Sequence, residues 1–256
     1  AGNTMMLKPS ELTPNLSAVL AKITREVFNE DEVALFEGDA AMAQALMALP
    51  LDHIFFTGSP TLGKIVMNAA AKHLTSVTLE LGGKTPTIVD DTADLKKAAK
   101  IIMWGKFTNN GQTCIAPDHV YVHQTVKEAF LEECRQVLAK VFGSGYEAQL
   151  ANPDYCRIVN ERHFGRISNL LTAAKDAGAK VAAGGGVSAN ERFIQPTLLT
   201  DVPADSQIMQ EEIFGPVLSV ATFKDYDEAI KIANDTIYGL GAGVWTRDAH
   251  EMYQVP

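Results

Sequence analysis

The stretch "DHIFFTGSPTLGKIVMNAAAKHLTSVTLELGG", residues 52–83, decides the fold class of this chain. It opens with an apolar run over residues 52–58 that predicts a buried strand, continues with a helical pattern over 60–74, and ends in a second strand pattern over 76–83. A strand, a helix and a strand in succession are typical of two parallel strands joined by a crossover helix. The stretch therefore predicts an α/β fold with a doubly wound parallel sheet, in which ligands bind at the carboxyl ends of the strands.

The same alternation extends in both directions from this stretch. Strand patterns recur at residues 4–10, 32–38, 85–90, 119–123, 218–223 and 240–246, and pieces of strand and turn are expected around residues 193–199. Helical patterns recur at residues 14–28, 40–49, 93–107, 125–142, 160–178 and 227–235. The run "AAGGGVSANE", residues 182–191, predicts a flexible surface loop. Gly82 and Gly83 allow the chain to turn sharply, so we expect a domain boundary there, between residues 1–81 and 82–256.

The composition predicts a globular chain with a sizeable core. Hydrophobic residues make up 46% of its 256 residues, and its formal net charge is −9, which argues against nucleic acid or an anionic membrane as the main partner. Three cysteines do not make a disulfide framework, and neither an 18-residue apolar run nor a signal peptide is visible. We therefore expect a soluble, cytoplasmic protein. Both ends look cut, so we also expect a fragment of a longer protein.

One cysteine stands apart from the others. The run "KFTNNGQTCIAP", residues 106–117, places Cys114 among small, polar and turn-prone residues just after a helical pattern. The thiolate is the reactive form of cysteine, and backbone N–H groups of such a loop would stabilise either the thiolate or an oxyanion beside it. The alternative is an inert thiol at the end of a helix. Cys134 shares a helix face with Phe130, which predicts a core position, and Cys156 has no supporting motif.

Glu80 interrupts an otherwise apolar strand in "TLELGGK". Charged residues are rarely buried without a partner or a function, and burial would raise the pKa of this carboxyl towards the range of a general base. The alternative is a carboxylate paired with a nearby lysine such as Lys84. This segment alone favours neither interpretation.

Two turns in the first part of the chain are candidates for binding a nucleotide. In "FFTGSPTLGK", Gly58 would let the backbone approach a phosphate, Ser59 could donate its hydroxyl, and Gly63 would let the following helix pack tightly. The alternative is an ordinary strand–helix turn with Ser59 as the helix cap. In "LKPSELTP", Lys8 and Glu11 could hold two ribose hydroxyls, or could belong to an exposed charged turn.

A last motif, "QEEIFGPV", lies at residues 210–217. Glu212 could hold a sugar while Phe214 flanks a flat ring; the alternative is a surface turn before a strand. The six histidines show no metal-binding spacing, and no GxSxG nucleophile elbow is present, so we expect no metal site.

In this order, the motifs resemble those of the aldehyde dehydrogenase superfamily. The resemblance rests on Lys8–Glu11, Phe56–Ser59 with Gly63, Glu80–Lys84, Gly111–Cys114 and Glu212–Pro216. It covers essentially the whole chain. Residues 64–84 and 153–164 resemble the class 3, fatty-aldehyde and coniferyl-aldehyde branch, whereas residues 233–256 look more like short-chain and betaine-aldehyde relatives.

The resemblance implies a role for each part of the chain. Residues 1–81 match the C-terminal portion of a Rossmann-like NAD(P)-binding domain, and residues 82–256 match an α/β catalytic domain truncated at its C-terminus. The family's second oxyanion donor, an asparagine in a Pro-Trp-Asn motif, is absent from this sequence, and Asn109 and Asn110 lie too near Cys114 to replace it. The full-length protein is expected to form a homodimer or homotetramer.

The resemblance also implies site residues. Cys114 matches the catalytic nucleophile and Glu80 the general base. The residues that match cofactor contacts are Lys8 and Glu11 for the adenosine ribose, Gly58 and Ser59 for the pyrophosphate, Glu212 for the nicotinamide ribose, Phe214 beside the nicotinamide, and Gly63, Leu81 and Gly82 around them. Thr113 and Ile115 flank the nucleophile and are expected to line the substrate tunnel.

The implied activity is NAD(P)-dependent oxidation of a small aldehyde to its carboxylic acid. Glu11 favours NAD over NADP, because a carboxylate there would repel a 2′-phosphate. Two other functions stay open: a non-catalytic or crippled fragment that kept the fold, and acyl transfer to coenzyme A. Because the upstream asparagine is missing, we expect these 256 residues alone to be catalytically impaired. Retention of both Cys114 and Glu80 argues against the first, and Glu80, as a water-activating base, argues against the second.

Overall fold

The computed structural model describes residues 2–254, with side chains described up to Tyr253. The chain divides into two compact units, Ala1–Leu81 and Gly82–Pro256. Both consist of helices and mainly parallel strands, so the predicted α/β fold class is confirmed.

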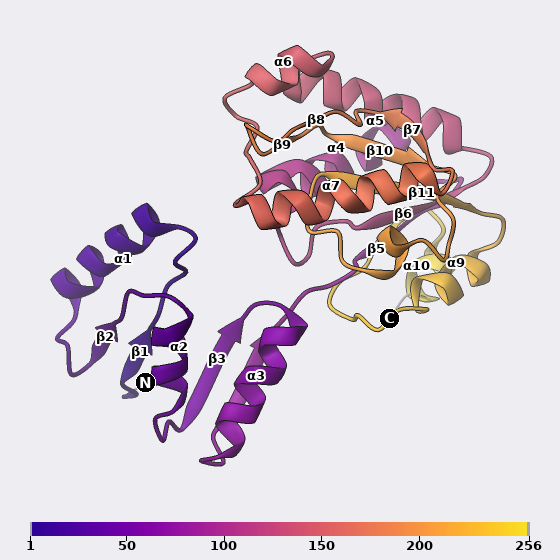
Figure 1. The fold of residues 1–256 in the computed structure, drawn as a ribbon. Coiled ribbons are helices and arrows are strands. Elements are labelled where there is room, and N and C mark those ends of the chain that lie inside the picture. Colours follow the sequence, from indigo (N-terminus) through magenta and orange to yellow (C-terminus); the bar gives the residue numbers. More distant parts are fainter. Residues whose placement is uncertain (1, 255–256) are drawn as a thin grey trace. The chain divides into compact units, whose positions relative to one another are not determined.

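The first unit contains two pairs of parallel strands. β1 (Met5–Leu7) pairs with β2 (Val33–Leu35), and β3 (His53–Thr57) pairs with β4 (Ser76–Glu80). The helices of this unit are α1 (Pro14–Val27), α2 (Ala40–Met47) and α3 (Pro60–Ala71) (Figure 1). The strand–helix–strand order predicted from residues 52–83 is therefore present as β3, α3 and β4.

α3 packs on one face of the β3–β4 pair. Ser59 caps the helix, its Oγ accepting a hydrogen bond from the backbone N–H of Leu62. Gly63 is buried against the strand, because a Cβ there would lie 2.9 Å from a methyl carbon of Leu81. The predicted tight packing at Gly63 is thereby confirmed.

The prediction that β3 is a buried strand was wrong. Its side chains alternate between exposed and half-buried, and Phe55 is 67% exposed. Alternate side chains of a strand point to opposite faces of the sheet, and among the described residues of this unit α3 covers one face only. A short apolar run does not reveal whether one or both faces of a strand are covered.

The second unit is built on a six-stranded sheet in the order β12-β5-β6-β11-β10-β7. Its strands are β5 (Pro86–Val89), β6 (His119–His123), β7 (Lys180–Ala183), β10 (Thr197–Thr200), β11 (Val217–Phe223) and β12 (Gly243–Trp245). All neighbours are parallel except β7, which runs antiparallel to β10 at the edge.

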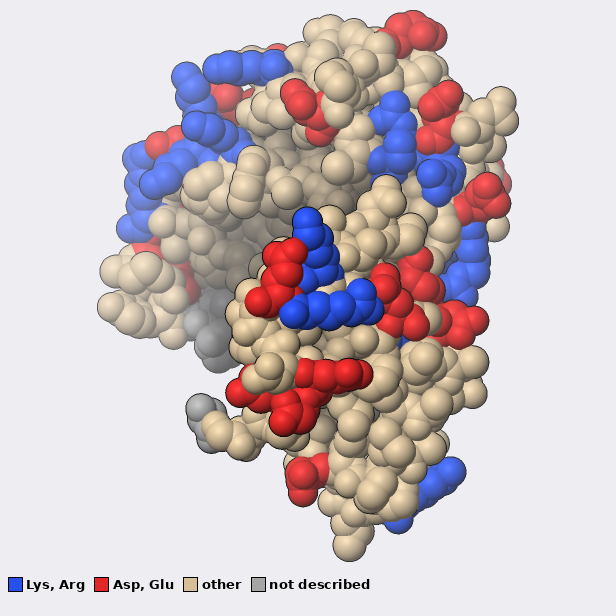
Figure 2. Space-filling view, turned by 90° about the vertical axis from the view of Figure 1, so that its left-hand side faces the viewer, with Lys and Arg blue, Asp and Glu red and all other residues tan. Residues whose placement is uncertain are grey.

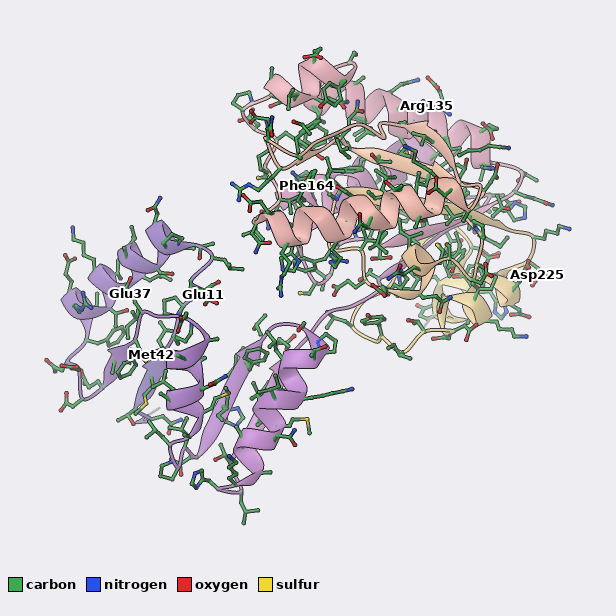
Figure 3. The ribbon with its side chains drawn as sticks, in the orientation of Figure 1. Glu11, Glu37, Met42, Arg135, Phe164 and Asp225 are labelled. Carbon is green, nitrogen blue, oxygen red and sulfur yellow. The ribbon has the colours of Figure 1, made fainter. Side chains whose placement is uncertain are left out.

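Helices cover both faces of this sheet. Those of this unit are α4 (Leu95–Phe107), α5 (Lys127–Phe142), α6 (Tyr146–Ala151), α7 (Glu161–Asp176), α8 (Gln207–Gln210), α9 (Tyr226–Ala233) and α10 (Ala249–Gln254) (Figure 1). Leu198 belongs to a core cluster with residues of α4 and α5, whereas the next residue, Leu199, belongs to a second cluster with residues of α7. One member of the second cluster is Phe164, which is labelled on α7 in Figure 3. All four residues of β10 and the first four of β11 are buried, as expected for strands covered on both faces. Cys134 lies fully buried on α5, which confirms its predicted core position.

Several elements were not predicted. They are α6, α8, β7, β8 (Val187–Ser188) and the short 3₁₀ helix η1 (Thr108–Gly111). β8 forms a hairpin with β9 (Phe193–Ile194), which lies within the strand and turn pieces predicted at residues 193–199. The prediction that residues 182–191 form only a loop was wrong, because they include the end of β7 and all of β8. Three successive glycines, Gly184–Gly186, suggested a loop, but only the first two adopt positive φ angles.

The surface charges and the helices of the described residues can be compared with the expectation that neither nucleic acid nor a membrane is the main partner. Figure 2 shows Lys and Arg side chains interspersed with Asp and Glu on the face that it presents, so no broad basic surface covers that face. Within residues 2–254, we found no helix with the length and apolar character needed to cross a bilayer.

Candidate functional site

Cys114 lies at the end of an unusual turn that follows α4. Asn109, Asn110 and Gly111 have positive φ angles of 51°, 60° and 70°, and the backbone N–H of Gln112 closes the turn by donating to the Asn109 carbonyl over 3.1 Å. Asparagine and glycine tolerate this left-handed conformation best. Gly111 also packs directly on Gly215, whose carbonyl oxygen would lie 2.4 Å from a Cβ at position 111.

The cysteine itself is accessible. Cys114 is a partly exposed free thiol, whereas burial raises the pKa of the Cys134 thiol well above its ordinary value. Cys156 is exposed. Of the two residues beside Cys114, Thr113 is half-buried and Ile115 is 61% exposed.

Gly82 and Gly83 connect the cysteine loop with the predicted ribose-binding carboxylate. A Cβ on Gly83 would lie 2.9 Å from the carbonyl oxygen of Cys114. The backbone N–H of Gly83 donates a hydrogen bond to Glu212 Oε1 over 3.0 Å, and a Cβ on Gly82 would lie 2.0 Å from Glu212 Oε2. The backbone carbonyl of Cys114 and the carboxylate of Glu212 therefore both lie against the same glycine pair.

Burial raises the pKa of the Glu212 carboxyl, while the hydrogen bond from Gly83 opposes this rise. The same carboxylate faces Gly82 with its second oxygen. Phe214, two residues further on, is half-buried and has a positive φ of 47°.

Charged side chains fix the backbone on both sides of Glu212. Lys84 Nζ donates to Asp118 Oδ1 over 2.5 Å and to the carbonyls of Ile208 and Glu211. Asp118 Oδ2 accepts the backbone N–H of Ile213 over 2.8 Å.

Arg166 on α7 adds to this support. Its guanidinium donates to the carbonyls of Glu212 and Ile213 over 3.1 and 2.6 Å. Backbone groups of residues 211, 212 and 213 are therefore all bonded by side chains from other elements.

The charges under the site are buried and balanced. Burial alone would raise the pKa of the Asp118 carboxyl, but the neighbouring His119 and the ammonium groups of Lys84 and Lys106 lower it to about 2. Lys106, fully buried on α4, has its pKa lowered by burial to about 8, although the carboxylates of Asp118 and Glu212 counteract this. Two cationic side chains, Lys84 and Lys106, thus interact with the carboxylates of Asp118 and Glu212 in the buried part of this unit.

The remaining predicted residues lie in the first unit. Lys8 Nζ donates to Glu11 Oε2 over 3.1 Å, so the predicted pair is formed, and hydrogen bonds from its own backbone and from Lys8 lower the pKa of Glu11. Glu11 is labelled beside the turn after β1 in Figure 3. The backbone N–H of Gly58 donates to the carbonyl of Glu80 over 2.9 Å, which brings the predicted phosphate turn to the end of β4.

The prediction that Glu80 is buried was wrong. It is the last residue of β4, and its side chain is exposed. Side chains alternate along β4, and Glu80 follows the exposed positions Ser76 and Thr78 rather than the half-buried Val77 and Leu79.

Sequence reasoning missed the polar residues that support the site. They are Asn110, Gln112, Lys106, Asp118 and Arg166. Lys106, Asn110 and Gln112 lie within the recognised run 106–117, Asp118 follows it directly, and Arg166 belongs to the predicted helix at residues 160–178. Nothing in the sequence pattern reveals their hydrogen-bond partners. Within residues 2–254, no group of three or more His, Cys, Asp or Glu side chains is placed to hold a metal ion.

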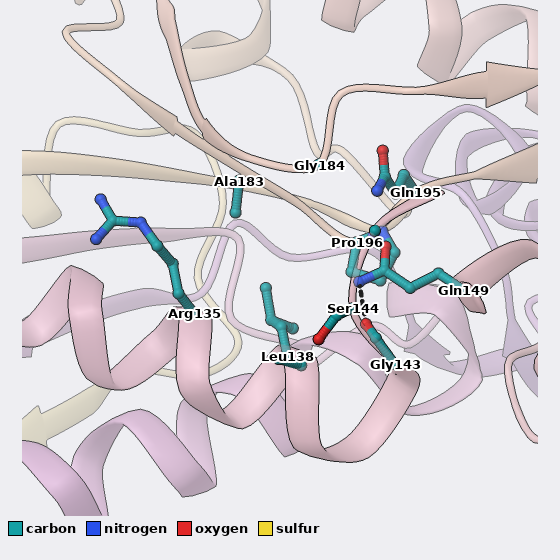
Figure 4. Close-up of a pocket in the computed structure, with 11 residues that line it drawn as sticks. Arg135, Leu138, Gly143, Ser144, Gln149, Ala183, Gly184, Gln195 and Pro196 are labelled. Carbon is teal, nitrogen blue, oxygen red and sulfur yellow. Dashed lines mark hydrogen bonds between the residues drawn. The ribbon is translucent and has the colours of Figure 1, made fainter. Parts of the chain in front are cut away.

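A cavity of about 230 Å³ lies elsewhere in the second unit, between α5, α6 and the turns at Gly184 and Pro196 (Figure 4). Gln149, one of its lining residues, donates to the Gly143 carbonyl over 2.9 Å. The cavity contains none of the predicted site residues.

Comparison with known proteins agrees with the motifs. The profile of the "Aldehyde dehydrogenase family" matches residues 1–256. The 4,4'-diaponeurosporen-aldehyde dehydrogenase of Staphylococcus aureus is 43% identical over 255 residues, which are 100% of this chain and 54% of that protein. Aldehyde dehydrogenase family 3 member A2 of Mus musculus is 42% identical over 248 residues, 97% of this chain and 50% of that protein. The chain thus spans about half the length of these curated relatives.

Solved structures give the same result. A substrate-bound Staphylococcus aureus AldH matches with a TM-score of 0.92 and 42% identity, over 99% of this chain and 54% of that one. Lactaldehyde dehydrogenase of Escherichia coli matches with a TM-score of 0.89 and 35% identity, again over 99% and 54%. The motifs, the glycine-centred arrangement of Cys114 and Glu212, and these matches agree: the chain belongs to the aldehyde dehydrogenase family.

Proposed function

We propose that this chain carries the nucleophile, the base and much of the cofactor site of an NAD(P)-dependent aldehyde dehydrogenase that releases a carboxylic acid. The observation that carries the proposal is the meeting of the cysteine loop and the Glu212 carboxylate at Gly82 and Gly83. The backbone carbonyl of the proposed nucleophile and a carboxylate suited to a ribose lie next to the same glycine pair, and glycines allow a ligand to approach the backbone closely.

Cys114 is the nucleophile in this proposal. Its thiolate adds to the aldehyde carbon and forms a thiohemiacetal, whose oxyanion accepts hydrogen bonds from backbone N–H groups of the loop. When the oxyanion collapses, the C–H bond breaks with its electron pair and a thioester to Cys114 remains. Cys114 is partly exposed, whereas Cys134 is buried, and the exposed Cys156 lies in no supporting motif.

The residues around Glu212 fit a nicotinamide nucleotide. Bound NAD(P)+ would supply the acceptor for the hydride. Glu212 presents carboxylate oxygens that could accept two ribose hydroxyls, and Phe214 lies two residues away. In the first unit, the bonded pair of Lys8 and Glu11 could hold the other ribose, and the turn at Gly58 and Ser59 opens the N-terminus of α3 to a phosphate.

Glu80 is the general base of the second half-reaction. It takes a proton from a water molecule, whose oxygen adds to the thioester carbon; the C–S bond then breaks, and the carboxylic acid and the thiol are released. Glu80 lies three residues before Gly83 in the sequence, and its exposed carboxylate is open to water.

An assay of NADH absorbance tests the proposal. A polypeptide that includes residues 1–256, extended to the length of its relatives if turnover requires it, is mixed with NAD+ and a panel of aldehydes, with and without coenzyme A. We expect NADH formation that is independent of coenzyme A and is abolished in Cys114→Ala. Dependence on coenzyme A would favour acyl transfer, and full turnover by Cys114→Ala would refute the role of the cysteine.

A further inference from the structure

The loop that carries Cys114 is held by side chains rather than by a backbone ladder. Its residues Asn109, Asn110 and Gly111 all have positive φ angles, a conformation that costs free energy for residues other than glycine. Within the described part of the chain, no backbone–backbone hydrogen bond joins residues 109–114 to residues 155–159. Something else must keep the loop in this conformation.

Two carboxamides make that connection. Gln112 Nε2 donates to the carbonyls of Asn109 and Arg157 over 3.1 and 3.2 Å, and its Oε1 accepts the backbone N–H of Val159 over 2.9 Å. Asn110, which is fully buried, donates from Nδ2 to the carbonyl of Cys156. Together they bond three of the four residues in the segment 156–159, which is far from the loop in sequence.

The segment that receives these bonds is itself anchored. The backbone N–H of Ile158 donates to the Arg192 carbonyl over 3.1 Å, and Arg192 Nη1 donates back to the carbonyl of Val159 over 2.8 Å. The Ile158 side chain is fully buried in the core cluster of α7. The segment 156–159 is therefore a fixed support rather than a free loop.

We propose that Asn110 and Gln112 are positioning residues, which bind the cysteine loop to the segment 156–159 and so hold the thiol and backbone N–H of Cys114 in place for the reaction. This inference rests on the proposed function only in assigning the reaction to Cys114. The mechanical coupling of the two segments through the carboxamides holds independently.

The expected loss of kcat can be derived from how far the reacting group is displaced. A displacement of a reacting group by about 1 Å can lower a rate by about a hundredfold. Loss of the Gln112 carboxamide would free the loop, while the contacts of Glu212 to Gly83 and Arg166 would stay intact. We therefore expect Gln112→Leu to lower kcat by about tenfold to a hundredfold and to leave the KM for NAD+ unchanged.

Hydrogen exchange of backbone amides, followed by mass spectrometry, tests the coupling directly. In the unaltered protein, the amides of residues 113–115 and of Val159 are expected to open together, with the same free energy of opening. Gln112→Leu should accelerate exchange in both segments. Gln112→Glu, which keeps an acceptor for Val159 but loses both donors, should accelerate exchange of the loop while the Val159 amide stays protected.

Asn152 offers a matched control. Its carboxamide also donates to two carbonyls, those of Val141 and Phe142, and accepts one backbone N–H, that of Asp154. Asn152→Leu therefore removes the same number of bonds from the same unit, and exchange in residues 109–115 should not change.

The outcomes separate this inference from the proposed function. Independent opening of the two segments in the unaltered protein, or a kcat for a folded Gln112→Leu equal to that of the unaltered protein, would overturn the positioning role. Turnover that survives Cys114→Ala would instead overturn the proposed nucleophile. The coupled exchange would still stand in that case, because it needs no reaction.

Discussion

Gly83 donates its backbone N–H to Glu212 Oε1 over 3.0 Å, although 129 residues separate the two along the chain. The bond ties the glycine pair that follows β4 to the segment before β11, and the carbonyl of Cys114 lies against the same glycine. The positions of two proposed functional groups thus depend on residues without side chains.

Gly82→Ala tests this dependence. A Cβ at position 82 would lie 2.0 Å from Glu212 Oε2, so the carboxylate must move away. Because that oxygen is at the end of a flexible side chain, we expect a loss of about 1 kcal/mol in the free energy of unfolding, the value of one hydrogen bond. NAD+ binding, measured by calorimetry, should weaken much more than stability does.

The control for this substitution is Gly165→Ala on α7. No heavy atom lies within 4 Å of a Cβ at position 165, and alanine favours a helix interior over glycine by about 1 kcal/mol. We expect a more stable protein with unchanged NAD+ affinity. Equal NAD+ affinity in Gly82→Ala and Gly165→Ala would contradict the placement of Glu212 in the cofactor site.

Lys84→Met tests the buried support of the Glu212 segment. It removes the partner of Asp118 and two hydrogen bonds to carbonyls, and breaking a buried ion pair on one side costs about 3–5 kcal/mol. Denaturant unfolding should show this loss. The surface pair of Lys180 with Asp201 is the control, since Lys180→Met removes an ion pair that water screens and should leave the free energy of unfolding nearly unchanged.

Unfolding at acid pH tests the contribution of the Asp118 carboxylate to stability. The pKa of Asp118 is lowered from 3.8 to about 2 in the folded chain, so its contribution is complete above pH 3.8 and is lost as the pH falls towards 2. In Asp118→Asn this part of the pH dependence should be missing from the free energy of unfolding. If the free energy of unfolding falls equally with acid pH in the unaltered protein and in Asp118→Asn, the loss of stability does not come from Asp118.

The lowered pKa of Lys106 should make the free energy of unfolding depend on pH in the alkaline range. Burial lowers its pKa from 10.5 to about 8, so between these values the unfolded chain binds a proton that the folded chain does not. The free energy of unfolding should therefore rise with pH across this range, by an amount on the order of 3 kcal/mol.

Lys106→Met isolates this contribution from other groups that titrate at alkaline pH. The substitution should abolish the rise while the profile at neutral pH keeps its shape. A rise of equal size in Lys106→Met would assign it to another group.

The fold could be predicted from sequence where each element has its own periodicity. β3, α3 and β4 occur in the predicted order, and so do α4, β6 and α5, because apolar positions repeat with the period of each element. β7 and α6 were missed because they are short and lie among glycines and polar residues. Burial was the weakest prediction, as Phe55 and Glu80 show, because it depends on what covers a strand rather than on the strand's own sequence.

The site could be predicted only as far as its motifs extend. Cys114 and Glu212 were recognised from short runs of sequence, and the structure brings both to Gly82 and Gly83. The residues that hold them, such as Gln112 and Arg166, act through backbone groups of distant segments, and side-chain-to-backbone bonds leave no pattern in one sequence.

The most direct test of the central claim is to trap the acyl intermediate. Glu80→Gln should let Cys114 attack an aldehyde and should release one equivalent of NADH in a burst, but should hydrolyse the thioester slowly. Mass spectrometry of the peptide that contains Cys114 is then expected to show the added acyl group, and Cys114→Ala should show none. An acyl group on another residue, or steady-state turnover of Glu80→Gln equal to that of the unaltered protein, would contradict the account.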